Sequence, residues 1–105
     1  MNAIIRGTTP TITFTFDTVD TSNITEAYIT IKSVNDLDTA IVQNSLATAT
    51  VASGSISWEL SQTDTFKLTA GDTVNVYCDW KEGTVRGRSQ VATCRVFETG
   101  VDEVI

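Results

Sequence analysis

Apolar and polar residues alternate along most of this chain, with the two-residue period of a β-strand. The alternation is clearest from Thr11 to Asp17, where large apolar residues fill every second position and threonines lie between them. Strands of this kind bury one face and expose the other to water. The pattern predicts four inward-facing rows: Ile12, Phe14 and Phe16; Ala27, Ile29 and Ile31; Ile56, Trp58 and Leu60; and Val74, Val76, Cys78 and Trp80.

Turn residues divide this alternation into about seven short strands, spaced roughly 8 to 12 residues apart. That spacing is typical of an antiparallel β-sandwich, so we predict an all-β fold with one domain over residues 1–105. A closed barrel is the alternative, because a strand count does not show whether a sheet closes. The seven predicted strands are Thr11 to Asp17, Glu26 to Val34, Ala40 to Gln43, Leu46 to Ala52, Ser55 to Leu60, Asp72 to Lys81 and Arg88 to Phe97. Ala3 to Arg6 and the tail from Gly100 to Ile105 are candidates for additional edge strands.

One helical turn is predicted between two of these strands. Ser61 is followed three residues later by Asp64, the arrangement that caps the start of a helix. Phe66 and Leu68 come next, and Gly71 ends the segment. We therefore expect a single short helical turn that carries the chain from one sheet to the other.

The charge balance narrows the choice of partners. Thirteen acidic residues against seven basic ones give a formal net charge of −6 and a pI near 4.3. A phosphate backbone would be repelled by such a surface, so we expect no nucleic-acid partner. The sequence has no secretory signal and no apolar run of membrane-spanning length, which predicts synthesis in the cytoplasm and no membrane partner.

The residue inventory argues against catalysis. The chain has no histidine, so the Ser-His and Cys-His nucleophile pairs cannot be assembled. Its carboxylates are scattered through predicted turns and wet faces, and we predict neither an enzyme nor a cofactor. Cys78 and Cys94 lack the spacing of a zinc site, and we expect buried thiols, with a disulfide between them as the alternative.

Two acidic loops are the weak candidates for a metal site. Asp17 and Asp20, and Asp36 and Asp38 in the next loop, offer the oxygen ligands that Ca²⁺ prefers. The spacing is not that of an EF-hand, and aspartates in turns usually bond to their own backbone. We therefore expect turn residues here and predict no metal.

Aromatic residues are candidates for a contact surface where they face water. Trp58 and Trp80 lie on inward rows, which favours core indoles over exposed carbohydrate platforms. Tyr28 and Tyr77 fall on the opposite, water-facing rows. We therefore expect the tyrosines, rather than the tryptophans, to contact a partner.

Lys81, Arg86 and Arg88 form the one basic cluster of the sequence: Lys81 and Arg88 flank a predicted hairpin connection from Glu82 to Gly87, and Arg86 lies in it. We call these three residues the basic tip. Such a cluster is either a solvated hairpin end or a docking point for an acidic neighbour.

Several landmarks run through the chain in a characteristic order. A Gly-Thr-Thr-Pro-Thr-Ile-Thr-Phe start is followed by an Ile-Thr-Ile-Lys strand, then Ser-Trp-Glu-Leu-Ser-Gln-Thr-Asp-Thr, a Gly-Asp strand with Tyr77, and a Gly83-Thr84 hairpin. This order resembles the small β-sandwich proteins encoded in structural gene clusters of tailed bacteriophages and prophages. In outline it is similar to the immunoglobulin-like N-terminal domain of phage baseplate upper proteins.

The resemblance implies a non-catalytic virion structural or accessory protein, located in the virion, in the head decoration, neck, tail or baseplate. Its partners would be other virion proteins, and copies of the chain in a homo-oligomer. Contacts would be made through sheet edges, including the terminal segments 1–10 and 98–105, since open strands can add to a neighbouring sheet. The alternative function is a carbohydrate-binding or adhesin-like module.

Overall fold

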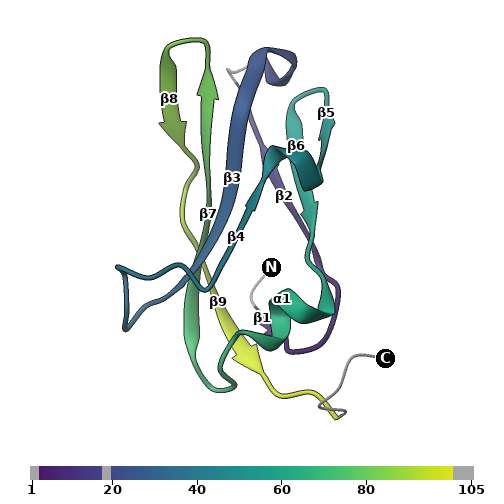
Figure 1. The fold of residues 1–105 in the computed structure, drawn as a ribbon, viewed down its shortest axis with the longest axis vertical. Helices are drawn as coiled ribbons and strands as arrows, with labels where there is room; N and C mark the ends of the chain where they lie inside the picture. Colours follow the sequence, from purple (N-terminus) through teal and green to yellow (C-terminus); the bar gives the residue numbers. More distant parts are fainter. Residues whose placement is uncertain (1–2, 18–19, 101–105) are drawn as a thin grey trace.

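The computed structural model describes residues 3–17 and 20–100, which form two facing β-sheets. Its elements in chain order are β1 (Ala3–Ile5), β2 (Thr11–Thr15), the 3-10 turn η1 (Thr21–Asn23), β3 (Ile24–Ser33), β4 (Val42–Ser45), the 3-10 turn η2 (Leu46–Thr48), β5 (Ala49–Ala52), β6 (Ser55–Glu59), α1 (Gln62–Phe66), β7 (Thr73–Glu82), β8 (Val85–Arg88) and β9 (Ala92–Phe97). Figure 1 shows β8, β7 and β3 on the left and β2, β6 and β5 on the right. The prediction of a mostly β fold is confirmed.

The two sheets differ in size. The larger one has the order β1-β9-β7-β3-β4, with β8 also on β7, and the smaller one has the order β2-β6-β5. All pairs are antiparallel except β1 with β9, where Ala3 lies beside Arg95 in a parallel ladder. The predicted N-terminal strand is therefore present, but its parallel pairing departs from a purely antiparallel fold.

Ser89 interrupts the strand that we predicted from Arg88 to Phe97. The Ser89 amide donates to the Cys78 carbonyl over 2.8 Å, and its Oγ accepts from the Cys78 amide over 2.9 Å. The side chain thus takes the place of a backbone acceptor, and the regular ladder stops there. As a result β8 and β9 are two separate strands along the same edge of β7.

Two of the weaker strand predictions shift along the chain. The predicted segments Ala40 to Gln43 and Leu46 to Ala52 correspond to β4 and β5, which begin two and three residues later. For β5 the cause is Ser45, whose Oγ accepts from the Ala47 amide over 3.3 Å and caps η2, so that β5 begins only after this turn. The tail segment from residue 101 to 105 lies outside the described residues.

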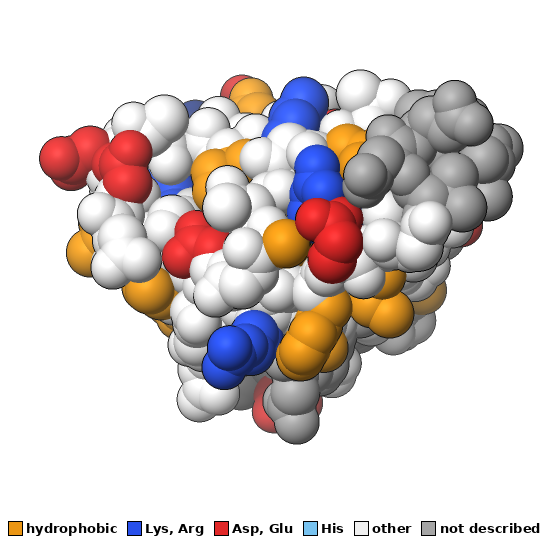
Figure 2. Space-filling view, turned by 90° about the horizontal axis from the view of Figure 1, so that it is seen from below, with side chains coloured by type: hydrophobic (Ala, Val, Ile, Leu, Met, Phe, Trp, Pro, Cys, Tyr) orange, Lys and Arg blue, Asp and Glu red, His pale blue; other side chains and the backbone are white. Residues whose placement is uncertain are grey.

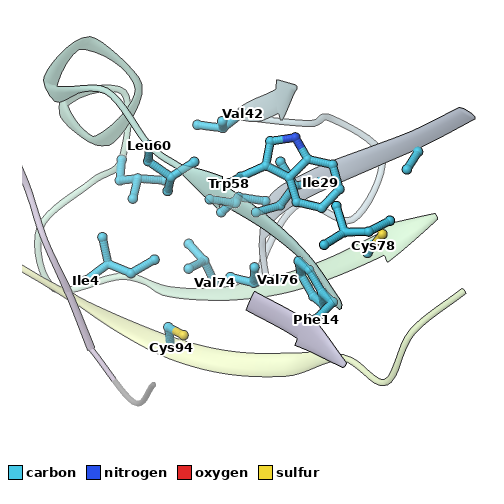
Figure 3. Close-up of a cluster of buried hydrophobic side chains, with 14 of the residues drawn as sticks. Ile4, Phe14, Ile29, Val42, Trp58, Leu60, Val74, Val76, Cys78 and Cys94 are labelled. Carbon is cyan, nitrogen blue, oxygen red and sulfur yellow. The ribbon is translucent and has the colours of Figure 1, made fainter. Parts of the chain in front are cut away.

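The inward rows meet in one core between the sheets (Figure 3). Each predicted row supplies buried residues, and Ile29, Ile31, Ile56, Trp58 and Leu60 have no exposed surface. The Trp58 indole packs edge-on against Phe14, with ring centroids 5.9 Å apart. Its Nε1 also donates to the Ser45 carbonyl of the opposite sheet over 2.9 Å, so Trp58 joins the layers by packing and by a hydrogen bond.

The predicted helical turn is confirmed as α1, which connects β6 of the smaller sheet to β7 of the larger. Ser61 Oγ accepts from the Asp64 amide over 3.0 Å, and the Asp64 carboxylate accepts from the Ser61 amide in return. The next residue, Thr65, is buried and donates to the Thr8 carbonyl over 2.9 Å. The turn therefore also fixes the loop between β1 and β2.

Trp80 packs against the core, as expected, but it is only partly buried, whereas Trp58 has no exposed surface. It lies opposite Gly87 on β8, and a Cβ at Gly87 would come within 2.2 Å of the indole. The other side of the ring meets Phe16 edge-on at 5.9 Å. The ring therefore rests on a glycine near the hairpin end, and part of it reaches solvent.

The two tryptophans should differ in their effect on stability. We expect Trp58→Ala to lower the free energy of unfolding by about 3 to 5 kcal/mol, as for other fully buried aromatic residues. Trp80→Ala should cost less, because part of its surface is already in water. Urea titration followed by circular dichroism measures both. Equal losses would contradict the difference in burial.

Candidate interaction surface

The candidate residues of the β7–β8 hairpin lie on the outer face of the larger sheet. Lys81 is directly opposite Arg86, and on its other side it is opposite Glu26 of β3. The two cations are exposed and share one face, because residues that pair across a ladder point to the same side. Like charges in directly opposite positions repel, and Glu26 on the other side of Lys81 offsets part of this cost.

Arg88 forms an ion pair with its cross-strand neighbour on β7. It lies opposite Asp79, and its Nε donates to Asp79 Oδ1 over 2.8 Å. This hydrogen bond, with the charge of Asp79, raises the pKa of the Arg88 guanidinium. Within the basic tip, Arg88 is therefore already paired with Asp79. Lys81 and Arg86 form no ion pair within residues 3–17 and 20–100.

Tyr77 is buried, with 6% of its surface exposed, although we predicted it on a water-facing row. It does lie on the outer face, but long cationic side chains cover it. The Arg88 guanidinium is 4.5 Å from the centre of the ring, and the Lys32 ammonium is 6.0 Å from it. Tyr28, by contrast, is 42% exposed, as predicted, and remains open to a partner.

A hollow of about 380 Å³ joins these groups into one surface. It brings Tyr28 next to Lys81 and Arg86, and it adds Glu26, Asp79 and Thr84, which we did not predict. The cross-strand register could have indicated the two added acids, because it places Glu26 opposite Lys81 and Asp79 opposite Tyr28. The hollow thus carries both signs of charge, with Asp79 already paired with Arg88, and Lys81 and Arg86 are the groups in it that can bind a carboxylate of another protein.

The four weak calcium candidates do not come together. Asp20 Oδ1 caps η1 by accepting from the amide and the hydroxyl of Ser22, over 3.0 and 2.7 Å, and these bonds lower the pKa of Asp20. Asp36 Oδ1 accepts from the Asp38 amide over 3.2 Å. The two loops lie at opposite ends of β3, a ten-residue strand about 30 Å long. No group of three potential metal ligands occurs in the part of the chain that the structure describes, which includes Asp17.

Cys78 and Cys94 are two separate thiols that no disulfide joins. Cys94 lies opposite Val74, four residues along β7 from Cys78 (Figure 3). Both side chains are buried. Burial, with the nearby charge of Asp79, raises the pKa of Cys78 to about 12, and burial also raises the pKa of Cys94.

The far end of the molecule, where α1 and the end of β9 lie, offers no comparable surface among the described residues. Figure 2 shows that its charged side chains are of both signs and interspersed, with apolar side chains in small separate areas. One such mixed pair is Arg6 with Glu98, where Nη1 and Oε1 are 2.6 Å apart.

Comparisons with known proteins add no family to this geometry: no protein-family model and no curated protein sequence matches the chain. Among the described residues, no helix has the length and apolar character needed to cross a membrane.

The two thiols should be unreactive in the folded protein. At about pH 8, just below the ordinary cysteine pKa, a raised pKa leaves almost no thiolate to attack a disulfide reagent. We expect a chromogenic disulfide reagent to titrate neither thiol in native buffer and both in concentrated urea. Rapid release of colour from the native protein would contradict the burial of Cys78.

Proposed function

We propose that this chain is a non-catalytic structural or accessory protein of a tailed-bacteriophage or prophage virion, which acts through contacts with other virion proteins. The observation that carries the proposal is the cross-strand pair of Lys81 and Arg86 beside the exposed Tyr28. In a protein with a net charge of −6, Lys81 and Arg86 lie opposite each other, and neither forms an ion pair with a described residue, although Glu26 lies beside Lys81. Folding alone therefore gives little reason for this placement. An acidic partner surface supplies that reason.

We further infer that the two sheets form an immunoglobulin-like sandwich. The path β9-β7-β3-β4 corresponds to strands G-F-C-C′ of a variable-type immunoglobulin domain, and β2-β6-β5 corresponds to B-E-D. Two features depart from antibody domains. The buried tryptophan is on β6 rather than on the strand corresponding to C, and no disulfide joins Cys78 and Cys94. The strand order supports the resemblance to phage sandwich domains, which was based on sequence landmarks alone.

The basic tip suits recognition of an acidic neighbour for electrostatic reasons. Most of the protein surface repels another acidic protein, whereas Lys81 and Arg86 attract it, so the two molecules meet in one orientation. Tyr28 then offers an apolar ring with a polar end, a residue type that is enriched in protein interfaces. Because these groups lie on a paired sheet, their spacing is fixed before the partner binds.

A carbohydrate-binding module is the second candidate, and the partial exposure of Trp80 favours it. Sugars stack on exposed indoles, and the Trp80 ring, on the face of the sheet opposite Tyr28, lines a hollow of about 560 Å³ together with Phe16. Under this alternative, bacterial surface glycans would shift the tryptophan fluorescence of the wild type but not that of Trp80→Phe. The absence of any shift would remove this candidate.

Removing both free cations should impair assembly without harming the fold. We expect Lys81→Ser with Arg86→Ser to change the free energy of unfolding by less than about 0.5 kcal/mol, because both side chains are exposed. Complexes with the proteins encoded beside this chain should weaken, and the wild-type complexes should weaken with added salt. Co-expression followed by size-exclusion chromatography with light scattering measures both effects.

The matched control is Lys67→Ser with Arg95→Ser, which makes the same change in net charge at two exposed positions away from the hairpin. Complexes should survive in this variant. Equal behaviour of the two double variants, or undiminished assembly without Lys81 and Arg86, would contradict the proposed docking role.

A further inference from the structure

One side of β2 is an open sheet edge that the proposed docking surface does not use. β2 pairs with β6, and the Phe16 and Leu60 amides donate to the Gly54 and Pro10 carbonyls over 2.8 and 2.9 Å. Because alternate residues of an antiparallel strand bond to opposite sides, these contacts fix which residues face β6.

It follows that the backbone N–H and C=O groups of Thr11, Thr13 and Thr15 point away from β6. No hydrogen bond to these groups occurs within the described part of the chain. The edge therefore presents three evenly spaced donor–acceptor sets, a pattern that another β-strand satisfies.

Beneath this edge, two adjoining hollows of about 300 and 560 Å³ lie between β2 and the larger sheet. They share Thr13, Phe14 and Gln90, so they form one groove along the strand. Val76, Ala92 and Cys94 lie across the first hollow from β2, while Phe16 and Trp80 line the second. The groove therefore combines strand-binding backbone groups with apolar side chains.

The charges of the groove define the chemistry of its occupant. No charged side chain lines the first hollow, so an ionic group placed there would lose its hydration without compensation. The second hollow contains Asp17 and Arg88 at its far end, and Arg88 is already paired with Asp79. An uncharged segment with an apolar side chain at every second position fits both the edge and the groove.

We propose that an uncharged, extended segment of a partner protein adds to β2 as a fourth strand of the smaller sheet, with its inward side chains in the groove. This mode of binding is β-strand addition, in which backbone hydrogen bonds give affinity and alternate side chains give specificity. The inference rests on the proposed function, because it assigns the partner to the same assembly role, but it uses a different surface.

The structure favours a donated segment over a second copy of the chain. Pairing of two β2 edges would bring both larger sheets together, because β9 and the residues before it already lie across the groove from β2. A five-residue edge contact is also small beside the roughly 1,200 Å² that a stable interface buries. A single strand avoids the collision and fills the groove.

Two other edges of the structure carry features that discourage strand addition. β1 has only three residues, and β8 carries the cations Arg86 and Arg88. Short edges and charged side chains are the usual means of preventing edge pairing. The edges β4 and β5 are also uncharged but have four residues each, so β2, with five residues, is the longest uncharged edge.

The test uses an end-capped peptide of alternating valine and threonine, with a lysine at each end for solubility, and isotope-labelled full chain. On addition of the peptide, we expect the amide signals of Thr11, Thr13 and Thr15 to shift and their hydrogen exchange to slow. A peptide of the same composition, with its valines and threonines in two blocks, should have no effect.

Thr13→Pro removes one edge donor and leaves the β2–β6 ladder intact, because proline is tolerated where its missing N–H would face outward. We expect it to weaken peptide binding by about tenfold, the effect of losing a hydrogen bond and its alignment. Thr13→Val is the matched control: like the proline variant it loses the 2.9 Å contact between Thr13 Oγ1 and Ser57 Oγ, but it keeps the amide. It should bind as the wild type does.

Four results would overturn the proposal: no shifts at millimolar alternating peptide, equal binding by Thr13→Pro, slow exchange of the three amides in dilute protein without peptide, or a dimer that Thr13→Pro dissociates. The third result would assign the edge to the chain itself, and the fourth to a second copy.

Failure here leaves the role of Lys81 and Arg86 in assembly untouched, because neither residue lines the groove. Loss of the proposed assembly role would equally leave peptide binding measurable.

Discussion

The long antiparallel pairing of β3 with β7 is the constraint on which the other elements depend. It runs from Ile24 beside Glu82 to Ser33 beside Val74, and it carries β4 on one side and β8 and β9 on the other. A slip of one residue would move every inward side chain to the water face. The buried rows therefore fix the register, and the register in turn places Glu26 and Tyr28 beside Lys81 and Asp79 on the outer face. The core and the candidate surface are two consequences of the same pairing.

Features that depend on neighbours in the sequence were predictable. The inward rows followed from a period of two, and α1 followed from the three-residue spacing of Ser61 and Asp64, which the structure confirms as a capping box. Features that depend on distant residues were not. The parallel pairing of β1 with β9 joins residues about ninety positions apart, and no local pattern distinguishes it from an antiparallel edge. The division of β8 from β9 likewise depends on a serine side chain that bonds to Cys78.

The candidate surface shows the same limit at the level of single residues. Composition alone grouped Lys81, Arg86 and Arg88, but their cross-strand neighbours give them different roles. The tight turn at Gly83 pairs Glu82 with Val85, and counting outward from it places Arg86 on Lys81 and Arg88 on Asp79. Had we predicted a loop shorter than Glu82 to Gly87, the different cross-strand neighbours of Arg86 and Arg88 would have been evident from the sequence. Arg88 then covers Tyr77, which explains why a residue on a water-facing row is buried.

Trp80 connects the two surfaces that we assign to partners. Its backbone pairs with Gly87, between Arg86 and Arg88 of the hairpin, while its ring lines the groove beside β2 and meets Phe16. The missing side chain at Gly87 is what allows the ring to lie there. An open edge also exposes a protein to self-association, and here the net charge of −6 opposes the approach of identical copies. The acidic composition and the open edge are therefore compatible: repulsion keeps the copies apart, while an uncharged segment meets little electrostatic resistance at β2.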